Sequence, residues 1–174
     1  EGNLSAKQVE FARTIHGAGT DLLNLITDIL DLSKIESGTV IVMAESVVVE
    51  SVVESMVRPF RHEAETRHLS LDIQVDPILS RTMITDSKRL QQVLKNLLSN
   101  AFKFTEHGGI RLRVAPAVTG WSAEHPVLQH AGSVMAFEVA DTGIGIPQEK
   151  QRIIFEAFQQ ADAGTSRKYG GTGL

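Results

Sequence analysis

The segment Asn96–Thr105 contains three polar side chains whose types and spacing could do chemistry. Asn96, Asn100 and Lys103 stand at positions i, i+4 and i+7, so a helix presents them on one face. An amide oxygen is an uncharged hard ligand that suits Mg²⁺, and an ammonium group binds phosphate as a point charge. The stripe therefore predicts a site for a metal-bound polyphosphate. Apolar residues occupy the other faces of the same predicted helix: Val93, Leu94, Leu97, Leu98 and Ala101.

A second polar segment, Asp141–Ile146, follows the apolar run at 134–139. Gly143 and Gly145 allow a close backbone approach or a positive φ directly after the carboxylate. Taken alone, this segment is also explained by an ordinary Asp-rich turn. Together with the asparagine-bearing helix it indicates a ligand site. The chain closes on the glycine-rich segment Gly170–Leu174.

Composition narrows the class of protein. The chain has 174 residues, of which 42% are hydrophobic, enough for one domain of ordinary size or a small domain with an appendage. A net charge of −4 without a basic stripe argues against nucleic-acid binding. The absence of cysteine excludes disulfides and thiolate metal sites, and it fits a reducing compartment. No apolar run approaches the ~20 residues that span a bilayer, and no signal-peptide pattern is present, so we expect no membrane contact.

Residues 5–35 predict one long helix, with Ser5 and Gln8 as a capping box and Gly38 as a stop. A set of apolar residues recurs in alternating steps of four and three, the seam of a coiled coil or bundle: Phe11, Ile15, Ala18, Leu22, Leu25, Ile29 and Leu32. Three more widen this stripe and favour a multi-helix bundle: Leu23, Ile26 and Leu30. One helix cannot bury such a face, so partner helices are required.

The elements that must position the site follow this helix. Helical periodicity runs from 48 to 67, and Asp86 is placed to cap the asparagine-bearing helix. Strands are predicted at 40–42, 69–75, 110–114 and 134–139. The last two suggest a hairpin whose long tip, Pro116–Ser133, holds Trp121. Trp121 could bind a partner or pack the loop.

The asparagine-bearing segment, the Asp-Thr-Gly-Ile-Gly segment and the terminal Gly-Gly-Thr-Gly resemble the asparagine box and the two glycine boxes of the GHKL ATPases. Within that group they resemble the sensor histidine kinases. The segment 155–162 resembles their phenylalanine box, and the resemblance runs from Phe11 to Leu174. It implies an α/β fold, in which a long bundle helix precedes an α/β sandwich with a mixed sheet covered on one face by helices. Residues 1–37 would be the second helix of the dimerisation and phosphotransfer domain, and 38–174 the C-terminally truncated ATP-binding domain.

The resemblance also implies roles for single residues. Asp141 would accept a hydrogen bond from the adenine amine, and Phe104 would either lie against the adenine or pack in the core. Asn100 would be a ligand of Mg²⁺, Asn96 would support the metal or phosphate shell, and Lys103 would contact phosphate. Residues 155–169 would form a mobile lid over the nucleotide. The remaining cofactor contacts would come from the lid and the last glycine box: Arg167, Lys168, Gly171, Thr172 and Gly173.

Asn96 also bears on the type of reaction. The hydrolysing GHKL enzymes have a glutamate at this position that activates water, and an asparagine cannot take up a proton in that way. The resemblance therefore implies transfer of the ATP γ-phosphoryl group to a histidine and then to an aspartate of a response regulator. The expected partners are that regulator and a second copy of the chain, in the cytoplasm, with no nucleic acid. The alternatives are an ATP-hydrolysing GHKL enzyme and a non-catalytic dimerisation module.

The six histidines of the chain show no metal-ligand spacing, and we expect them on the surface or in loops. His16 is the one histidine on the long helix, but its neighbours Thr14–Ala18 do not form the family's phospho-acceptor motif and no acidic residue follows it. We therefore expect this chain alone not to phosphorylate itself, and the acceptor histidine to be absent from it. Incubation with radiolabelled ATP tests this expectation, and stable phosphate on His16 would contradict it.

Overall fold

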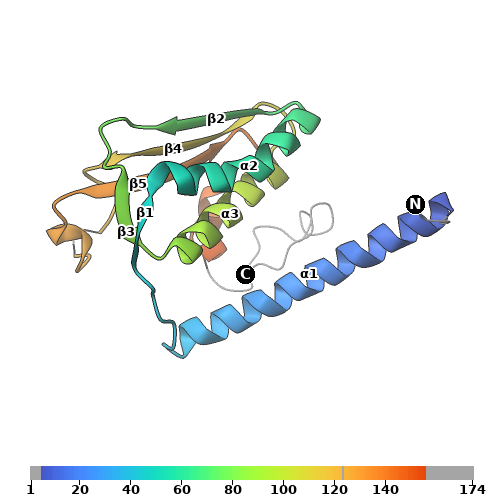
Figure 1. The fold of residues 1–174 in the computed structure, drawn as a ribbon, viewed down its shortest axis with the longest axis horizontal. Coiled ribbons are helices and arrows are strands. Elements are labelled where there is room, and N and C mark those ends of the chain that lie inside the picture. Colours follow the sequence, from blue (N-terminus) through green and yellow to red (C-terminus); the bar gives the residue numbers. More distant parts are fainter. Residues whose placement is uncertain (1–4, 123, 156–174) are drawn as a thin grey trace. The chain divides into compact units, whose positions relative to one another are not determined.

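The computed structural model describes residues 5–122 and 124–155. Val42–Gly145 form one compact unit, and the described residues 5–41 and 146–155 belong to another. Figure 1 shows the elements of both units in chain order. No helix within the described ranges is long and apolar enough to cross a membrane.

The first helix, α1 (Ala6–Glu36), confirms the predicted long helix and its start. The Ser5 hydroxyl accepts from the Gln8 amide at 3.3 Å, and the Gln8 side chain accepts from the Ser5 amide at 2.8 Å, which completes the capping box. Gly38 follows the helix with φ +66°, as a stop residue should. The apolar stripe is exposed along much of the helix, at Phe11, Ile15, Leu22, Leu23, Ile26, Ile29 and Leu30.

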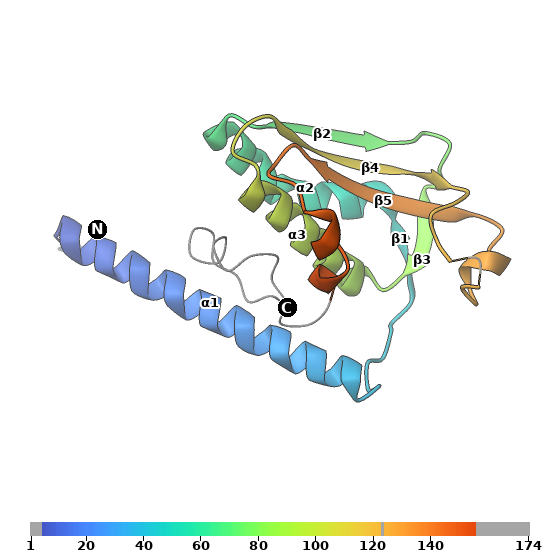
Figure 2. The same cartoon turned by 180° about the vertical axis from the view of Figure 1, so that it is seen from behind.

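The unit Val42–Gly145 is built on a three-stranded mixed sheet with the order β2-β4-β5. Strand β2 (Ser70–Val75) runs parallel to β4 (Gly109–Ala117), and β4 pairs antiparallel with β5 (Val134–Asp141). The three strands lie side by side in that order in Figure 2. The predicted hairpin with a long tip is confirmed, because β4 and β5 are consecutive strands joined by the Trp121 loop.

Two helices cover one face of this sheet, as both views of the fold show. Helix α2 spans Val49–Arg67 and helix α3 spans Ser87–Phe104. Their apolar faces meet alternate residues of β4, of which Leu112 and Val114 have no exposed surface. On the opposite face, Arg111 of β4 pairs with Asp72 of β2 at 3.2 Å, and both side chains are about half exposed. One face of the sheet is therefore core and the other is solvated, which confirms the expected architecture.

The predicted strand at residues 40–42 is wrong. The strand β1 lies at Glu45–Val48 and pairs antiparallel with β3 (Thr82–Thr85), an element that the sequence analysis does not contain. Val47 of β1 and Met83 of β3 pack against the core cluster that contains Val49 and Val53. The side chains of Ile41 and Val42 are 81% and 66% exposed. Apolar β-branched residues alone did not locate the strand, because pairing requires a partner strand and a face to bury.

Three short 3₁₀ turns complete the described elements: η1 (Leu128–His130), η2 (Gln148–Lys150) and η3 (Ile153–Phe155). Turn η1 lies in the β4–β5 connection, where Trp121 is half-buried. All six histidines are exposed, as expected, at 16, 62, 68, 107, 125 and 130.

Asp86 fixes the start of α3 with both carboxylate oxygens. Its Oδ1 accepts from the Arg89 amide at 3.1 Å, so the predicted cap is confirmed. Its Oδ2 accepts from the Met43 amide at 3.0 Å, which ties the segment before β1 to the helix start. The hydrogen bonds from the Met43 and Arg89 amides lower the pKa of Asp86, because they stabilise the charged form.

We predict that Asp86→Ala lowers the urea midpoint of the chain near neutral pH. Because the folded-state pKa is depressed, the carboxylate stabilises the fold above its unfolded pKa of about 3.9, and this contribution is lost as the pH falls through the folded value. The difference in midpoint between the wild type and Asp86→Ala should therefore shrink as the pH falls from about 6 to about 3. A difference that stays constant over this range would show that the charge of Asp86 contributes nothing.

Candidate functional site

Helix α3 has one buried side and one exposed side. Leu94 and Leu98 are 1% and 0% exposed, and each belongs to one of the two hydrophobic clusters that form the core. Asn96 and Asn100 lie on the exposed side of the helix, and neither amide side chain has a hydrogen-bond partner among the described residues. The sequence prediction that these amides leave the core face is confirmed. Their oxygens are therefore available to a ligand.

Lys103 lies in the last turn of α3, next to Phe104. Its ammonium nitrogen is 5.1 Å from the centre of the Phe104 ring, within the range of a cation–π contact. The side chain is half-buried, and desolvation lowers the pKa of Lys103 because burial penalises the charged form.

The end of α3 contacts the loop after β5 directly. The Ile144 amide donates to the Phe104 carbonyl at 3.3 Å, and the Asp141 Oδ1 atom accepts from the Gly143 amide at 2.8 Å. A Cβ atom on Gly143 would collide with the carbonyl of Phe104. Gly145 has φ +68° and open space around it. The two glycines therefore have different roles in the loop. Gly143 allows the backbone to approach the Phe104 carbonyl closely, and Gly145 allows a left-handed turn.

Thr142 holds the same loop to the start of β4, a role that the sequence analysis missed. Its hydroxyl donates to the His107 carbonyl and accepts from the Gly109 amide, both at 3.0 Å, while its own amide donates to the Gly109 carbonyl at 3.1 Å. The adjacent Gly108 has φ +96°, and a Cβ there would collide with the Thr142 hydroxyl. A hydroxyl residue between Asp141 and Gly143 was the available signal, because threonine can donate and accept at once.

Arg67, at the end of α2, was also missed. Its guanidinium donates to the carbonyls of Phe102 and Thr105, both at 2.6 Å. Charged hydrogen bonds of this kind contribute about 1.5–3 kcal/mol each in proteins. No sequence pattern points to them, because the partners lie 35 and 38 residues away. Thr105 itself is fully buried, and its hydroxyl has no partner among the described residues.

The structure therefore brings part of the predicted set together. The loop with Asp141, Gly143 and Gly145 adjoins the end of α3 at Phe104, while Asn96 and Asn100 lie further back along the exposed side of that helix. Asp141 is exposed at the end of β5. The other predicted cofactor contacts lie outside the described residues: Arg167, Lys168, Gly171, Thr172 and Gly173, with all of the expected lid except Phe155.

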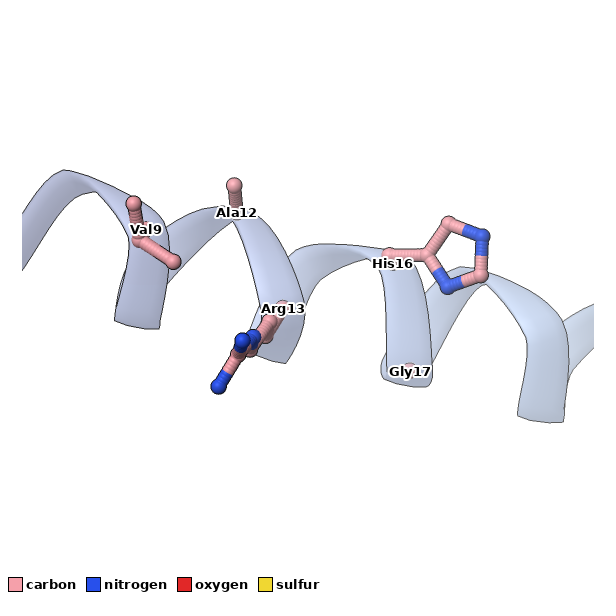
Figure 3. A pocket seen from close by; sticks show the side chains of 5 residues that line it. All are labelled: Val9, Ala12, Arg13, His16 and Gly17. Carbon is pink, nitrogen blue, oxygen red and sulfur yellow. The ribbon is translucent and has the colours of Figure 1, made fainter. Parts of the chain in front are cut away.

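Surface hollows in the described residues do not mark a competing site. One hollow on α1 is lined by Val9, Ala12, Arg13, His16 and Gly17 (Figure 3), and another on α2 is lined by Glu50, Ser51, Glu54, Ser55 and Arg58. Each is formed by the side of a single helix, so neither encloses a ligand. Within the described ranges, no group of three His, Cys, Asp or Glu side chains could hold a metal ion.

Comparison with known proteins identifies the family of the chain. The family model of the histidine kinase-, DNA gyrase B- and HSP90-like ATPases matches residues 85–174. The sensory/regulatory protein RpfC of Xanthomonas campestris is 40% identical over 98% of this chain, and the signal transduction histidine-protein kinase BarA of Escherichia coli is 36% identical over 98%. This chain covers 22% of RpfC and 18% of BarA, about a fifth of the length of these relatives.

Solved structures show the same fold. Full-length ShkA, crystallised in complex with AMPPNP, matches 99% of this chain with a TM-score of 0.74 and 28% identity, over 33% of its own length. The histidine kinase ThkA, crystallised with the response regulator protein TrrA, matches 92% with a TM-score of 0.65, over 42% of its own length; at 19% identity this likeness shows the fold alone. The chain therefore belongs to the histidine kinase-, DNA gyrase B- and HSP90-like ATPase family, as a histidine kinase catalytic domain preceded by a long helix.

Proposed function

We propose that this chain binds Mg·ATP and presents the γ-phosphoryl group to a histidine, from which it passes to an aspartate of a response regulator. One observation carries the proposal. The backbone contact between Phe104 and Ile144 joins the helix that bears the asparagines to the loop that bears Asp141. The metal-ligating, phosphate-binding and base-binding groups that the two segments supply therefore lie on neighbouring elements. The likeness to ShkA, which was crystallised with an ATP analogue, supports ATP as the ligand.

Each residue of the site has a role that its environment allows. Asp141, at the strand end, accepts a hydrogen bond from the adenine amine, which selects adenine over a base with a carbonyl at that position. Lys103 contacts phosphate, and Phe104 lies beside the base. Gly143 and Gly145 shape the loop that surrounds it. We assign the lid and last-glycine-box contacts to Arg167, Lys168, Gly171, Thr172 and Gly173.

Mg²⁺ suits the donors that α3 offers. The Asn100 amide oxygen is an uncharged hard ligand on an exposed helix face, and Asn96 stands one turn before it. Such a set fits a cation that keeps most of its ligands as water and phosphate oxygens, as Mg²⁺ does in nucleotide sites. Bound Mg²⁺ would supply neutralisation of phosphate charge. The residues of the chain itself bind and orient the nucleotide, which is the main contribution of proteins to phosphoryl transfer.

Asn96 favours transfer over hydrolysis. An amide at this place cannot accept a proton from water, so nothing on this stretch of α3 activates water against the γ-phosphate. The rival function, an ATP-hydrolysing enzyme of the same family, needs a base at position 96.

We further propose that residues 1–37 belong to the dimerisation and phosphotransfer domain and residues 38–174 to the ATP-binding domain. We place the protein in the cytoplasm, as the resemblance to the family implies. We propose a response regulator as its partner by analogy with ThkA, which was crystallised with one.

We predict that this chain binds Mg·ATP and ADP saturably in calorimetry, and that Asp141→Asn weakens both by about tenfold or more, the effect of losing a hydrogen bond to a charged acceptor. Asp72→Asn is the matched control, because Asp72 is a half-exposed carboxylate on the solvated face of the same sheet. Circular dichroism confirms the fold of each variant. Equal affinity of Asp141→Asn and the wild type would remove the adenine role of Asp141, and no binding by the folded wild type would overturn the proposal.

We also predict that the chain forms dimers through the stripe on α1, because Leu22 and Ile26 are 56% and 46% exposed and one helix cannot bury them. Leu22→Glu with Ile26→Glu should shift the mass in sedimentation equilibrium from dimer to monomer. Thr27→Glu, an exposed polar position on the same helix, should leave the mass unchanged. A monomeric wild type at micromolar concentrations would exclude dimerisation by this chain.

A further inference from the structure

We propose that Arg67 is a positioning residue for the adenine side of the site, although it lies on α2 and belongs to no nucleotide-binding motif. Its two hydrogen bonds hold the last turn of α3, and that turn in turn holds the loop with Asp141. The effect on nucleotide binding rests on the function proposed above. The effect on the loop itself rests only on the hydrogen bonds from Arg67 to the end of α3 and from Ile144 to Phe104.

The first step concerns the backbone carbonyls at the end of α3. The last carbonyls of an α-helix have no partner within the helix. Thr105, the C-cap of α3, is extended with φ −105° and ψ 115°, so the chain does not fold back to close them. Arg67 donates to the carbonyls of Phe102 and Thr105 instead, which spans the last turn. A planar guanidinium can serve two acceptors in fixed directions, and its charge suits the negative end of the helix.

The second step is that Arg67 is itself held in place. Glu63, one turn earlier on α2, pairs with the same guanidinium at 3.3 Å, and the Arg67 side chain is 33% exposed. Next to this contact, the ring of Phe60 on α2 stacks on the ring of Phe102, with centroids 5.1 Å apart and 21° between the planes. Helix α2 therefore fixes Phe102 through both its ring and its carbonyl, and the end of α3 has little freedom to shift.

The third step carries this constraint to the site. In the sequence, Phe104 lies between Phe102 and Thr105, whose carbonyls bind Arg67. The Phe104 carbonyl accepts a hydrogen bond from the Ile144 amide. Gly143 passes the same carbonyl so closely that a Cβ would collide with it. A small shift of the last turn of α3 would therefore either break the bond to Ile144 or push Gly143 away. The other end of the loop is held independently, by Thr142 on the start of β4.

The first experiment measures the loop without any nucleotide. We expect Arg67→Ala to raise hydrogen exchange at the Ile144 amide about tenfold or more at a temperature well below unfolding, while amides in the middle of β4 keep their protection. Arg61→Ala is the matched control, since Arg61 is an exposed arginine on the same helix that pairs with Glu54. A uniform rise at all amides would show a merely structural role, and unchanged exchange at Ile144 would overturn the proposal.

Arg67→Lys keeps the positive charge but removes the guanidinium group that donates to two carbonyls. This variant also replaces Arg67→Ala if Arg67→Ala does not fold. A single ammonium cannot serve both carbonyls in the directions that the guanidinium does. Exchange at Ile144 should therefore remain raised in Arg67→Lys. Exchange equal to that of the wild type would overturn the claim that both hydrogen bonds are needed.

The second experiment measures binding of ADP and of inosine diphosphate, which has a carbonyl in place of the adenine amine. The wild type should prefer ADP, and Arg67→Ala should lose about tenfold in ADP affinity and most of this preference, because the Gly143 amide that orients the Asp141 carboxylate is displaced. An unchanged preference in the folded variant would contradict positioning of the adenine side. If the wild type binds neither nucleotide, the proposed function fails, and the exchange of Ile144 still decides the role of Arg67.

Discussion

The contact between the last turn of α3 and the loop after β5 is the constraint on which the candidate site depends. A backbone amide, that of Ile144, meets a helix-end carbonyl, that of Phe104, and the loop passes so closely that Gly143 has no room for a side chain. Helix ends normally expose such carbonyls to water. Here a carbonyl at the end of α3 accepts a hydrogen bond from the loop that follows Asp141 at the end of β5.

The amphipathic character of α3 explains how one helix can serve both the core and the site. Leu94 and Leu98 are buried between α2 and the sheet, while the amides of Asn96 and Asn100 lie on the exposed side. The start of the helix is fixed by Asp86 and its end by Arg67. Because the core holds one side and two charged groups fix the ends, the exposed side can carry the two asparagines without a loss of order.

Membership of the histidine kinase-, DNA gyrase B- and HSP90-like ATPase family gives this arrangement its chemical meaning. That family includes hydrolases and phosphotransferases, so the fold alone does not decide the reaction. The difference has to lie in the groups near the γ-phosphate. An amide at position 96 offers metal or phosphate support and no proton acceptor, which is the physical basis for the proposed transfer to a histidine.

The sequence by itself determined much of this protein. The long first helix, the buried and exposed faces of α3 and the β4–β5 hairpin follow from periodicity and caps, which are local, and the motifs of the chain led to its family. The sequence did not determine the position of β1, the existence of β3, or the roles of Thr142 and Arg67. Those depend on partners that are distant in sequence, such as the carbonyls 35 and 38 residues after Arg67. Only the tertiary structure decides them, because strand pairing and hydrogen bonding at a helix end require that both partners are already in place.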